Sequence, residues 1–191
     1  MPRAYYNEHD PYAAAMLENL IAAGQIAPGD VDTRDILDVM PADLDGYTQC
    51  HFFAGVGIWS RALRSAGWPD GRPVWTGSCP CQPFSAAGAG LGVDDERHLF
   101  PGWHWLIQQH RPETVFGEQV ASPDGLDWAD LVQAAMEATD YACGFVDTCA
   151  AGFRSFHIRQ RLYYAADDLG YAASGLSDGE SNRWPERTHA A

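Results

Sequence analysis

Short apolar segments alternate with amphipathic segments along most of the 191-residue chain. The apolar segments are bounded by glycine, proline and polar turns, which is typical of buried strands. Strands are predicted within residues 4–10, 48–57, 74–79, 114–120, 142–150 and 161–166. Helices are predicted within residues 11–24, 58–67, 99–110 and 125–140. Residues 27–39 are predicted to form a turn with a short apolar piece, and residues 80–97 a long mobile loop.

The order of these segments predicts the fold class. Strands that alternate with helices favour an α/β protein with a doubly wound, mostly parallel sheet that helices cover on both faces. Such sheets bind ligands at the carboxyl ends of their strands. Because Gly55, Gly57, Cys81 and Glu118 each follow a predicted strand, we expect the functional site at this edge.

Residues 1–166 are predicted to form a single domain, and residues 167–191 a polar, poorly ordered tail. A chain of this length can bury one ordinary hydrophobic core. No apolar run approaches the roughly 20 residues that a membrane-spanning helix needs, and the N-terminal residues lack the apolar stretch of a signal peptide. We therefore expect a cytoplasmic protein.

The composition argues mildly against nucleic acid as a partner. The formal net charge is −14, and the basic residues are all arginines. An acidic protein repels phosphates unless its arginines gather on one face, so binding to DNA would need a local patch or a partner. The sequence Cys79-Pro-Cys81 lacks a second pair of ligands at the spacing of a zinc site, so no metal is expected.

Four short motifs are candidates for chemistry, although each has an ordinary structural explanation when it is taken alone. The glycine turn at 53–57 lets a ligand approach the backbone at a helix start, but a tight turn without a ligand explains it about as well. Cys81 could be a small buried apolar residue, and Glu118 a surface carboxylate. Residues 157–161 could form a solvated strand edge.

Taken together, the motifs closely resemble those of the cytosine carbon-5 DNA methyltransferases. FAGVG at 53–57 resembles the donor-binding turn of that family, and PCQPFS at 80–85, with Gly77 before it, resembles the segment that carries the nucleophile. GEQV at 117–120 stands where the family has Glu-Asn-Val, and RQRLYY at 159–164 resembles its paired-arginine strand. The resemblance implies the Rossmann-like fold of S-adenosylmethionine-dependent methyltransferases.

The resemblance also implies an activity, which is methyl transfer from S-adenosylmethionine to carbon 5 of cytosine in DNA through a covalent adduct with Cys81. Glu118, Arg159 and Arg161 would complete the catalytic set, with Glu118 at ring nitrogen 3 of the base. The residues implied to hold the donor are Phe53, Ala54, Gly55, Gly57, Glu8, His9 and Asp30. The residues implied to bind or position the substrate are Pro80, Gln82, Ser85 and Gln119.

Two further motifs stand in an unexpected place. NEHDPYA at 7–13 resembles the family's second motif, whose Glu binds the donor ribose, and GDV at 29–31 resembles its third, whose Asp reaches the adenine. In the family both follow the FAGVG strand, whereas here they precede it. We interpret this order as a circular permutation, which predicts that the strand before Phe53 pairs with the strands near Tyr6 and Trp75. An unrelated helix start at 7–13 is the alternative.

The sequence departs from the family pattern at several points. Gln119 replaces an Asn, His157 a Gln, and Ile58 a Gly. Few residues follow Tyr164, where family members continue into a region that reads DNA, so we expect a second polypeptide or a second copy to supply recognition. The alternatives are a donor-binding regulatory subunit with little activity alone, and the same chemistry on RNA or a free cytosine nucleotide. The lysine-free composition favours a GC-rich genome, such as that of a phage or its host.

Overall fold

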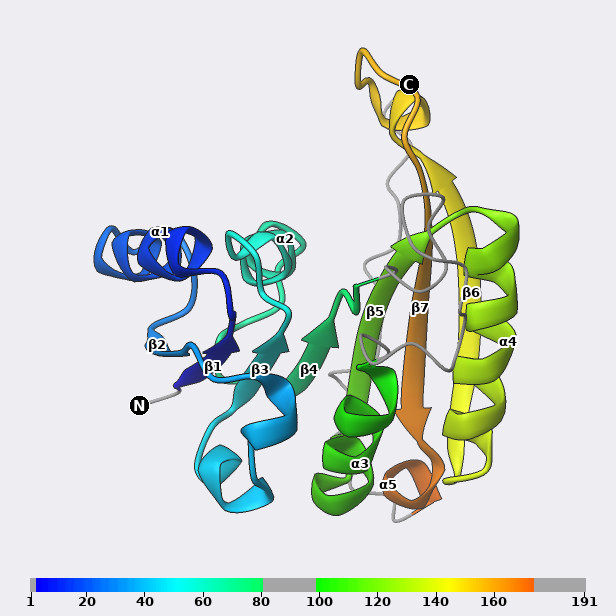
Figure 1. The fold of residues 1–191 in the computed structure, drawn as a ribbon, viewed down its shortest axis with the longest axis horizontal. Coiled ribbons are helices and arrows are strands. Elements are labelled where there is room, and N and C mark those ends of the chain that lie inside the picture. Colours follow the sequence, from blue (N-terminus) through cyan, green and yellow to red (C-terminus); the bar gives the residue numbers. More distant parts are fainter. Residues whose placement is uncertain (1–2, 81–98, 174–191) are drawn as a thin grey trace.

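A computed structural model describes residues 3–80 and 99–173 of the chain. Seven strands form one sheet in the order β2-β1-β3-β4-β5-β7-β6 (Figure 1). Strands β2, β1, β3, β4 and β5 are parallel to one another, whereas β7 is antiparallel to β5 and β6. The predicted α/β class with a mostly parallel sheet is therefore confirmed. The strands are β1 (Ala4–Asn7), β2 (Gly29–Asp32), β3 (Gln49–Phe52), β4 (Val74–Gly77), β5 (Thr114–Val120), β6 (Tyr141–Cys149) and β7 (Gln160–Asp168).

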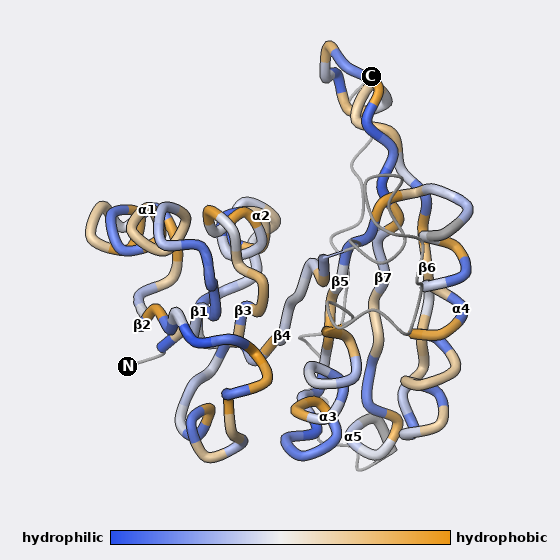
Figure 2. The backbone as a smooth tube through the Cα atoms, viewed as in Figure 1, coloured by the Kyte–Doolittle hydropathy of each residue, from blue (hydrophilic) through white to orange (hydrophobic). Residues whose placement is uncertain are grey.

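Helices cover both faces of the sheet. Successive residues of a strand point to opposite faces; Tyr6 of β1 packs with Leu17 of α1, whereas Tyr5 belongs to the larger core that contains Trp103 of α3 and Trp128 of α4. Hydrophobic and hydrophilic residues alternate along the helices, as they do where one side of a helix faces a sheet (Figure 2). The helices are α1 (Pro11–Ala22), α2 (Ile58–Ser65), α3 (Phe100–His110), α4 (Pro123–Glu137) and α5 (Leu169–Ala173).

The strand before the glycine turn, β3, lies between β1 and β4. His51 of β3 is in register with Tyr6 on one side and with Thr76 on the other. The three strands that were predicted to be neighbours are therefore neighbours. The N-terminal strand of the chain thus lies inside the sheet, between β2 and β3.

The start of α1 follows from its sequence. The side chain of Asp10 accepts a 2.8 Å hydrogen bond from the backbone amide of Ala13, and Pro11 occupies the first helical position, where its missing N–H costs nothing. Ser122 caps α4 in the same way, by accepting a 3.0 Å hydrogen bond from the amide of Gly125.

The structure corrects two predictions. Residues 27–39 contain the strand β2 instead of only a turn, because their backbone pairs with β1. The two strands lie so close that a Cβ on Gly29 would be 1.9 Å from the carbonyl oxygen of Ala4. Regular structure also continues past residue 166, through the end of β7 and into α5. Asp167 is in register with Thr114 of β5, and Asp168 with Tyr141 of β6. Their side chains also accept hydrogen bonds from Thr114 and Arg111, at 2.8 and 2.7 Å.

Candidate active site

The glycine turn connects β3 to α2. Phe53, Gly55 and Gly57 have positive φ values of 51, 53 and 74 degrees. This conformation is cheap for glycine but strained for phenylalanine, and backbone strain of this kind is concentrated at functional sites. Gly57 directly precedes α2 and has no side chain with which to cap the helix. The turn therefore combines an open backbone with a helix start, an arrangement that binds anionic ligand groups.

Glu8 lies against this turn, as the sequence predicted for a joint donor site. Its Oε2 accepts a 2.6 Å hydrogen bond from the amide of Gly55, and its Oε1 accepts one of 2.9 Å from the amide of Asp10. His9, the next residue, lies 3.3 Å through Nδ1 from the carbonyl oxygen of Thr33, just past β2. The carboxyl ends of β1, β2 and β3 thus meet at one place.

Asp30 does not reach this place. It is in register with Tyr5, two residues before the end of β1, and its carboxylate is bound by Arg3 and by the hydroxyl of Tyr47, the latter at 2.6 Å. The hydrogen bond from Tyr47 lowers the pKa of Asp30 below its ordinary value. Asp30 therefore serves an internal hydrogen-bond network nearer the amino ends of the strands.

Asp32, which the sequence analysis did not single out, is the last residue of β2 and lies at its carboxyl end. It is in register with Asn7, and its carbonyl oxygen accepts a 3.0 Å hydrogen bond from the amide of Glu8. Its carboxylate accepts hydrogen bonds from Tyr5 at 2.7 Å and from Arg34 at 2.6 Å. Burial raises the pKa of Asp32, but the hydrogen bonds from Arg34 and Tyr5 outweigh it, so that the pKa lies below its ordinary value.

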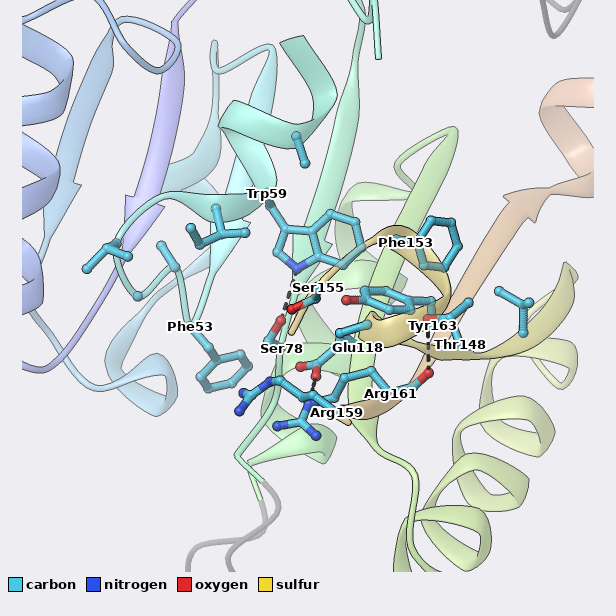
Figure 3. A pocket seen from close by; sticks show the side chains of 17 residues that line it. Phe53, Trp59, Ser78, Glu118, Thr148, Phe153, Ser155, Arg159, Arg161 and Tyr163 are labelled. Atoms are coloured by element: carbon cyan, nitrogen blue, oxygen red, sulfur yellow. Dashed lines mark hydrogen bonds and ion pairs between the residues drawn. The ribbon is translucent and has the colours of Figure 1, made fainter. Parts of the chain in front are cut away.

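Glu118 and Arg161 form an ion pair on the other side of the site. Arg161 Nε lies 2.5 Å from Glu118 Oε1, and both side chains are about one-fifth exposed, at 18% and 22% for Arg161 and Glu118. The pair joins β5 to the antiparallel strand β7 (Figure 3). Arg159 lies beside the pair in the same view. The structure thus brings together three of the residues that were predicted to be catalytic.

One cleft of about 900 Å³ connects the two sides (Figure 3). The glycine turn forms one wall, and the Glu118–Arg161 pair the other. Its lining includes Phe53, Ala54, Gly55, Trp59, Ser78, Glu118, Thr148, Phe153, Arg159, Arg161 and Tyr163.

The predicted nucleophile segment begins at this cleft. Trp59 of α2 donates a 3.0 Å hydrogen bond from its indole nitrogen to Ser78 Oγ. The buried Gln119 side chain spans from β5 to the same segment, where Nε2 donates a 3.4 Å hydrogen bond to the carbonyl oxygen of Cys79. Pro80 is exposed. The predicted site residues Cys81, Gln82 and Ser85 lie outside the described residues.

Two glycines allow the strands next to the site to pack closely. A Cβ on Gly117 would lie 2.0 Å from the ring of Tyr164, and one on Gly77 would lie 2.5 Å from the ring of Trp103. Neither position has room for a side chain. The glycines that precede Glu118 and the Cys79–Pro80 segment are therefore explained by packing.

Within residues 3–80 and 99–173, no cluster of three or more His, Cys, Asp or Glu side chains is arranged to hold a metal ion. No helix in the same ranges has the length and apolar character needed to span a membrane.

The fold is that of Rossmann-like methyltransferases. The structure is similar to that of the Schizosaccharomyces pombe Dnmt2 methyltransferase, with a TM-score of 0.51 and 14% identity over 95% of this chain and 57% of that one. It is also similar to a putative DNA modification methyltransferase encoded within an Escherichia coli prophage, with a TM-score of 0.54 and 13% identity over 88% of this chain and 41% of that one.

The sequence defines the family more narrowly. The profile of the C-5 cytosine-specific DNA methylase family matches residues 72–189, so the chain belongs to this family. A stretch of 60 residues is 45% identical to the type II methyltransferase M.NgoMIV of Neisseria gonorrhoeae, and covers 31% of this chain and 19% of that protein. The chain therefore spans only part of the length of the relatives that it matches.

Proposed function

We propose that this chain transfers a methyl group from S-adenosylmethionine to carbon 5 of cytosine in DNA. One observation carries the proposal. A single cleft is bordered on one side by the glycine turn with Glu8 and on the other by the Glu118–Arg161 ion pair, at the edge from which the Cys79–Pro80 segment leads to Cys81. A donor and a base bound there would be neighbours. Family membership supports the same chemistry.

The proposed roles of the protein residues follow from the chemistry of the base. Carbon 5 of cytosine is a poor nucleophile until a group adds at carbon 6. The Cys81 thiolate forms that bond, and unlike a serine alkoxide it is also a good leaving group. Glu118 binds ring nitrogen 3, and Arg161 and Arg159 bind oxygen 2 and nearby groups, so that the charge that develops on the ring is offset.

The end of the reaction restores the enzyme. After carbon 5 carries the methyl group, a general base removes the proton that is still bound to carbon 5. The electron pair of that bond returns to the ring, and the bond between Cys81 and carbon 6 breaks. A cytosine in a duplex must leave the base stack to reach this cleft.

The residues at the carboxyl edge fit S-adenosylmethionine. When bound, this donor supplies a methyl group on a positively charged sulfur. Glu8 has the carboxylate that vicinal ribose hydroxyls need, and a Cβ on Gly55 would meet no atom within 4 Å, so there is open space beside the turn. Phe53 and His9 provide rings for the adenine, and the start of α2 suits the donor carboxylate. We assign the carboxylate near the adenine to Asp32 instead of Asp30, because of its place at the end of β2.

We also propose that the chain is a circular permutation of the family's donor-binding half. The sheet order supports this proposal, because β1 and β2, which carry the ribose and adenine motifs, lie beside β3 although they precede it in sequence. A cut in a surface connection is tolerated when neighbouring strands keep their places.

The net charge of −14 supports the further proposal that a second polypeptide or a second copy contributes to DNA recognition. Mixing experiments with candidate partners would test it by comparing methylation rates and sequence preference with those of the chain alone.

A radioactive methyl-transfer assay tests the central proposal. Purified protein is incubated with labelled donor and, separately, duplex DNA, RNA and free cytosine nucleotide. Incorporation into carbon 5 of cytosine in DNA is expected. Label in RNA or the free nucleotide alone would correct the substrate class, and donor binding without transfer to any substrate would favour a regulatory subunit.

A further inference from the structure

The connection between β6 and β7 (residues 150–159, the hairpin tip) stands beyond the carboxyl edge of the parallel strands (Figure 1). It exposes three large apolar side chains, with Phe153 exposed at 72%, Phe156 at 108% and Ile158 at 85%. Neighbouring apolar side chains that are exposed together commonly mark a binding surface. Phe153 also lines the cleft, so this surface begins at the mouth of the candidate active site.

The hairpin tip has a defined conformation. Its base is closed by a 3.0 Å hydrogen bond from the amide of Ala150 to the carbonyl oxygen of Arg159. Within the tip, the amide of Ser155 donates to the carbonyl oxygen of Ala150 at 3.2 Å, and Ser155 Oγ lies 3.0 Å from His157 Nδ1. The apolar side chains are therefore presented by an ordered backbone, which reduces the entropy lost on binding.

The hairpin tip also differs in charge from the rest of the chain. Residues 148–166 contain no Asp or Glu in a protein whose net charge is −14, but they contain three arginines. Arg161 pairs with Glu118, whereas Arg154 and Arg159 have no carboxylate partner among the residues that the structure describes. Elsewhere, four arginines pair with aspartates, namely Arg3, Arg34, Arg64 and Arg111, whereas Arg61 donates a 2.6 Å hydrogen bond to Gln25.

We propose that the hairpin tip is a contact for the nucleic-acid strand that carries the target cytosine. Arg154 contacts a phosphate, and Phe156 stacks on a base next to the one that has left the duplex. Flipping a base leaves its neighbours partly unstacked, and aromatic side chains stack on bases of any sequence. An apolar tip that only joined two proteins would not need to be free of acidic residues. This inference rests on the proposed function, because that function places the target base in the cleft.

Two variants and two matched controls test the inference. Phe156→Ala removes an exposed aromatic ring, and Tyr12→Ala removes another, 74% exposed on α1. Arg154→Gln removes a cation at the tip, and Arg3→Gln removes one that precedes β1, with the same change in net charge. Binding to a fluorescent duplex with one mismatched cytosine is followed by anisotropy between about 50 and 200 mM salt, the range over which phosphate contacts are most apparent.

The two tip variants are expected to differ from each other. Phe156→Ala should weaken binding about tenfold without changing the salt dependence, since stacking on a base is not ionic. Arg154→Gln should reduce the slope of log affinity against log salt by about 0.9, which is the loss of one phosphate contact. Both control variants should bind like the wild type.

Equal affinity of Phe156→Ala and Tyr12→Ala for DNA would overturn the inference, and so would the absence of wild-type binding at the lowest salt. A change in the sedimentation of Phe156→Ala with unchanged DNA affinity would also overturn it, because it would indicate a protein interface. Methyl transfer by the wild type is measured separately. Transfer with normal DNA binding by the tip variants would refute only this inference. Loss of DNA binding in those variants without any wild-type transfer would refute only the proposed chemistry.

Discussion

Glu8 and Gly55 are 47 positions apart in sequence, yet Glu8 Oε2 accepts a 2.6 Å hydrogen bond from the Gly55 amide. The contact joins the end of the first strand of the chain to the turn that follows β3. Because β1 and β3 are parallel neighbours, their carboxyl ends meet whichever of them comes first in sequence. The proposed donor site can therefore be assembled from motifs in an unusual order.

Glu8→Gln should weaken the binding of S-adenosylmethionine by about 1.5–3 kcal/mol, the range for hydrogen bonds to a charged group. Glutamine keeps the length of the side chain but loses the charge that two ribose hydroxyls would share. Isothermal titration calorimetry provides the measurement. Glu18→Gln, at an exposed position of α1, is the control. Unchanged affinity in the Glu8 variant would refute the assignment of Glu8 to the ribose.

Asp32→Asn should weaken donor binding by about 1 kcal/mol or more, whereas Asp30→Asn should have little effect on it. Asp32 lies at the end of β2 and adjoins Glu8 through the backbone, whereas Asp30 lies two residues before that end. The same calorimetric titration compares the two variants, and thermal unfolding checks that each is folded. The reverse order of affinities would restore Asp30 as the residue near the adenine.

Cys81→Ser should abolish methyl transfer and leave donor binding nearly intact, because the thiol acts on the base. DNA that contains 5-fluorocytosine should trap the wild-type protein covalently, since fluorine at carbon 5 prevents the final loss of a proton. Mass spectrometry of the digested complex identifies the modified cysteine. An adduct on Cys79 would show that the wrong cysteine of the pair was chosen.

Most of the fold could be predicted from the sequence because its strands are apolar and its helices carry their own end signals. The Asp10 cap and Pro11 fixed the start of α1 to the residue. The strand β2 was not predicted, because its sequence GDVD has neither apolar alternation nor β-branched residues beyond Val31. Pairing with β1, a long-range interaction, determines that strand.

The site was predictable where a motif fixes both the residue and its strand, as for Glu118, Arg161 and the glycine turn. The place of Asp30 relative to the end of its strand could not be predicted, because a motif of three residues does not state how far the strand continues. Strand register decides that point, since Asp32 and not Asp30 is opposite Asn7 at the strand end. The partners of Gln119 and Glu8 also come from other strands, and no local pattern could indicate them.

Gly117→Ala should destabilise the protein by about 1–3 kcal/mol or more, because the new methyl group would overlap the buried ring of Tyr164. Gly144→Ala is the matched control, since it lies in strand β6, on the other side of β7, and a Cβ there would meet no atom within 4 Å. Urea unfolding followed by circular dichroism gives both free energies. Equal stability of the two variants would show that Tyr164 can move aside at little cost.

His51 should make the stability depend on pH between about 6.5 and 3. Its Nδ1 lies 2.8 Å from Thr76 Oγ1, its ring stacks on Tyr6 with centroids 5.0 Å apart, and burial lowers its pKa from 6.5 to about 3. Below pH 6.5 the unfolded chain therefore binds a proton that the folded protein does not. The free energy of unfolding should fall by about 1.4 kcal/mol for each pH unit below pH 6.5. Above pH 6.5, the stabilising contribution of His51 should be fully present.

Urea unfolding of the wild type and His51→Gln at pH 7, 6 and 5 measures this dependence. The variant has no group to protonate at this position, so its stability should change less between pH 6 and 5 than that of the wild type. His104, whose pKa is also lowered by burial, contributes in the same direction, and His104→Gln separates the two histidines. Carboxylates with lowered pKa values, such as Asp32, lose their contribution only near pH 4 and below, outside this range. An unchanged slope in His51→Gln, together with a reduced slope in His104→Gln, would assign the dependence to the half-buried histidine of α3 instead.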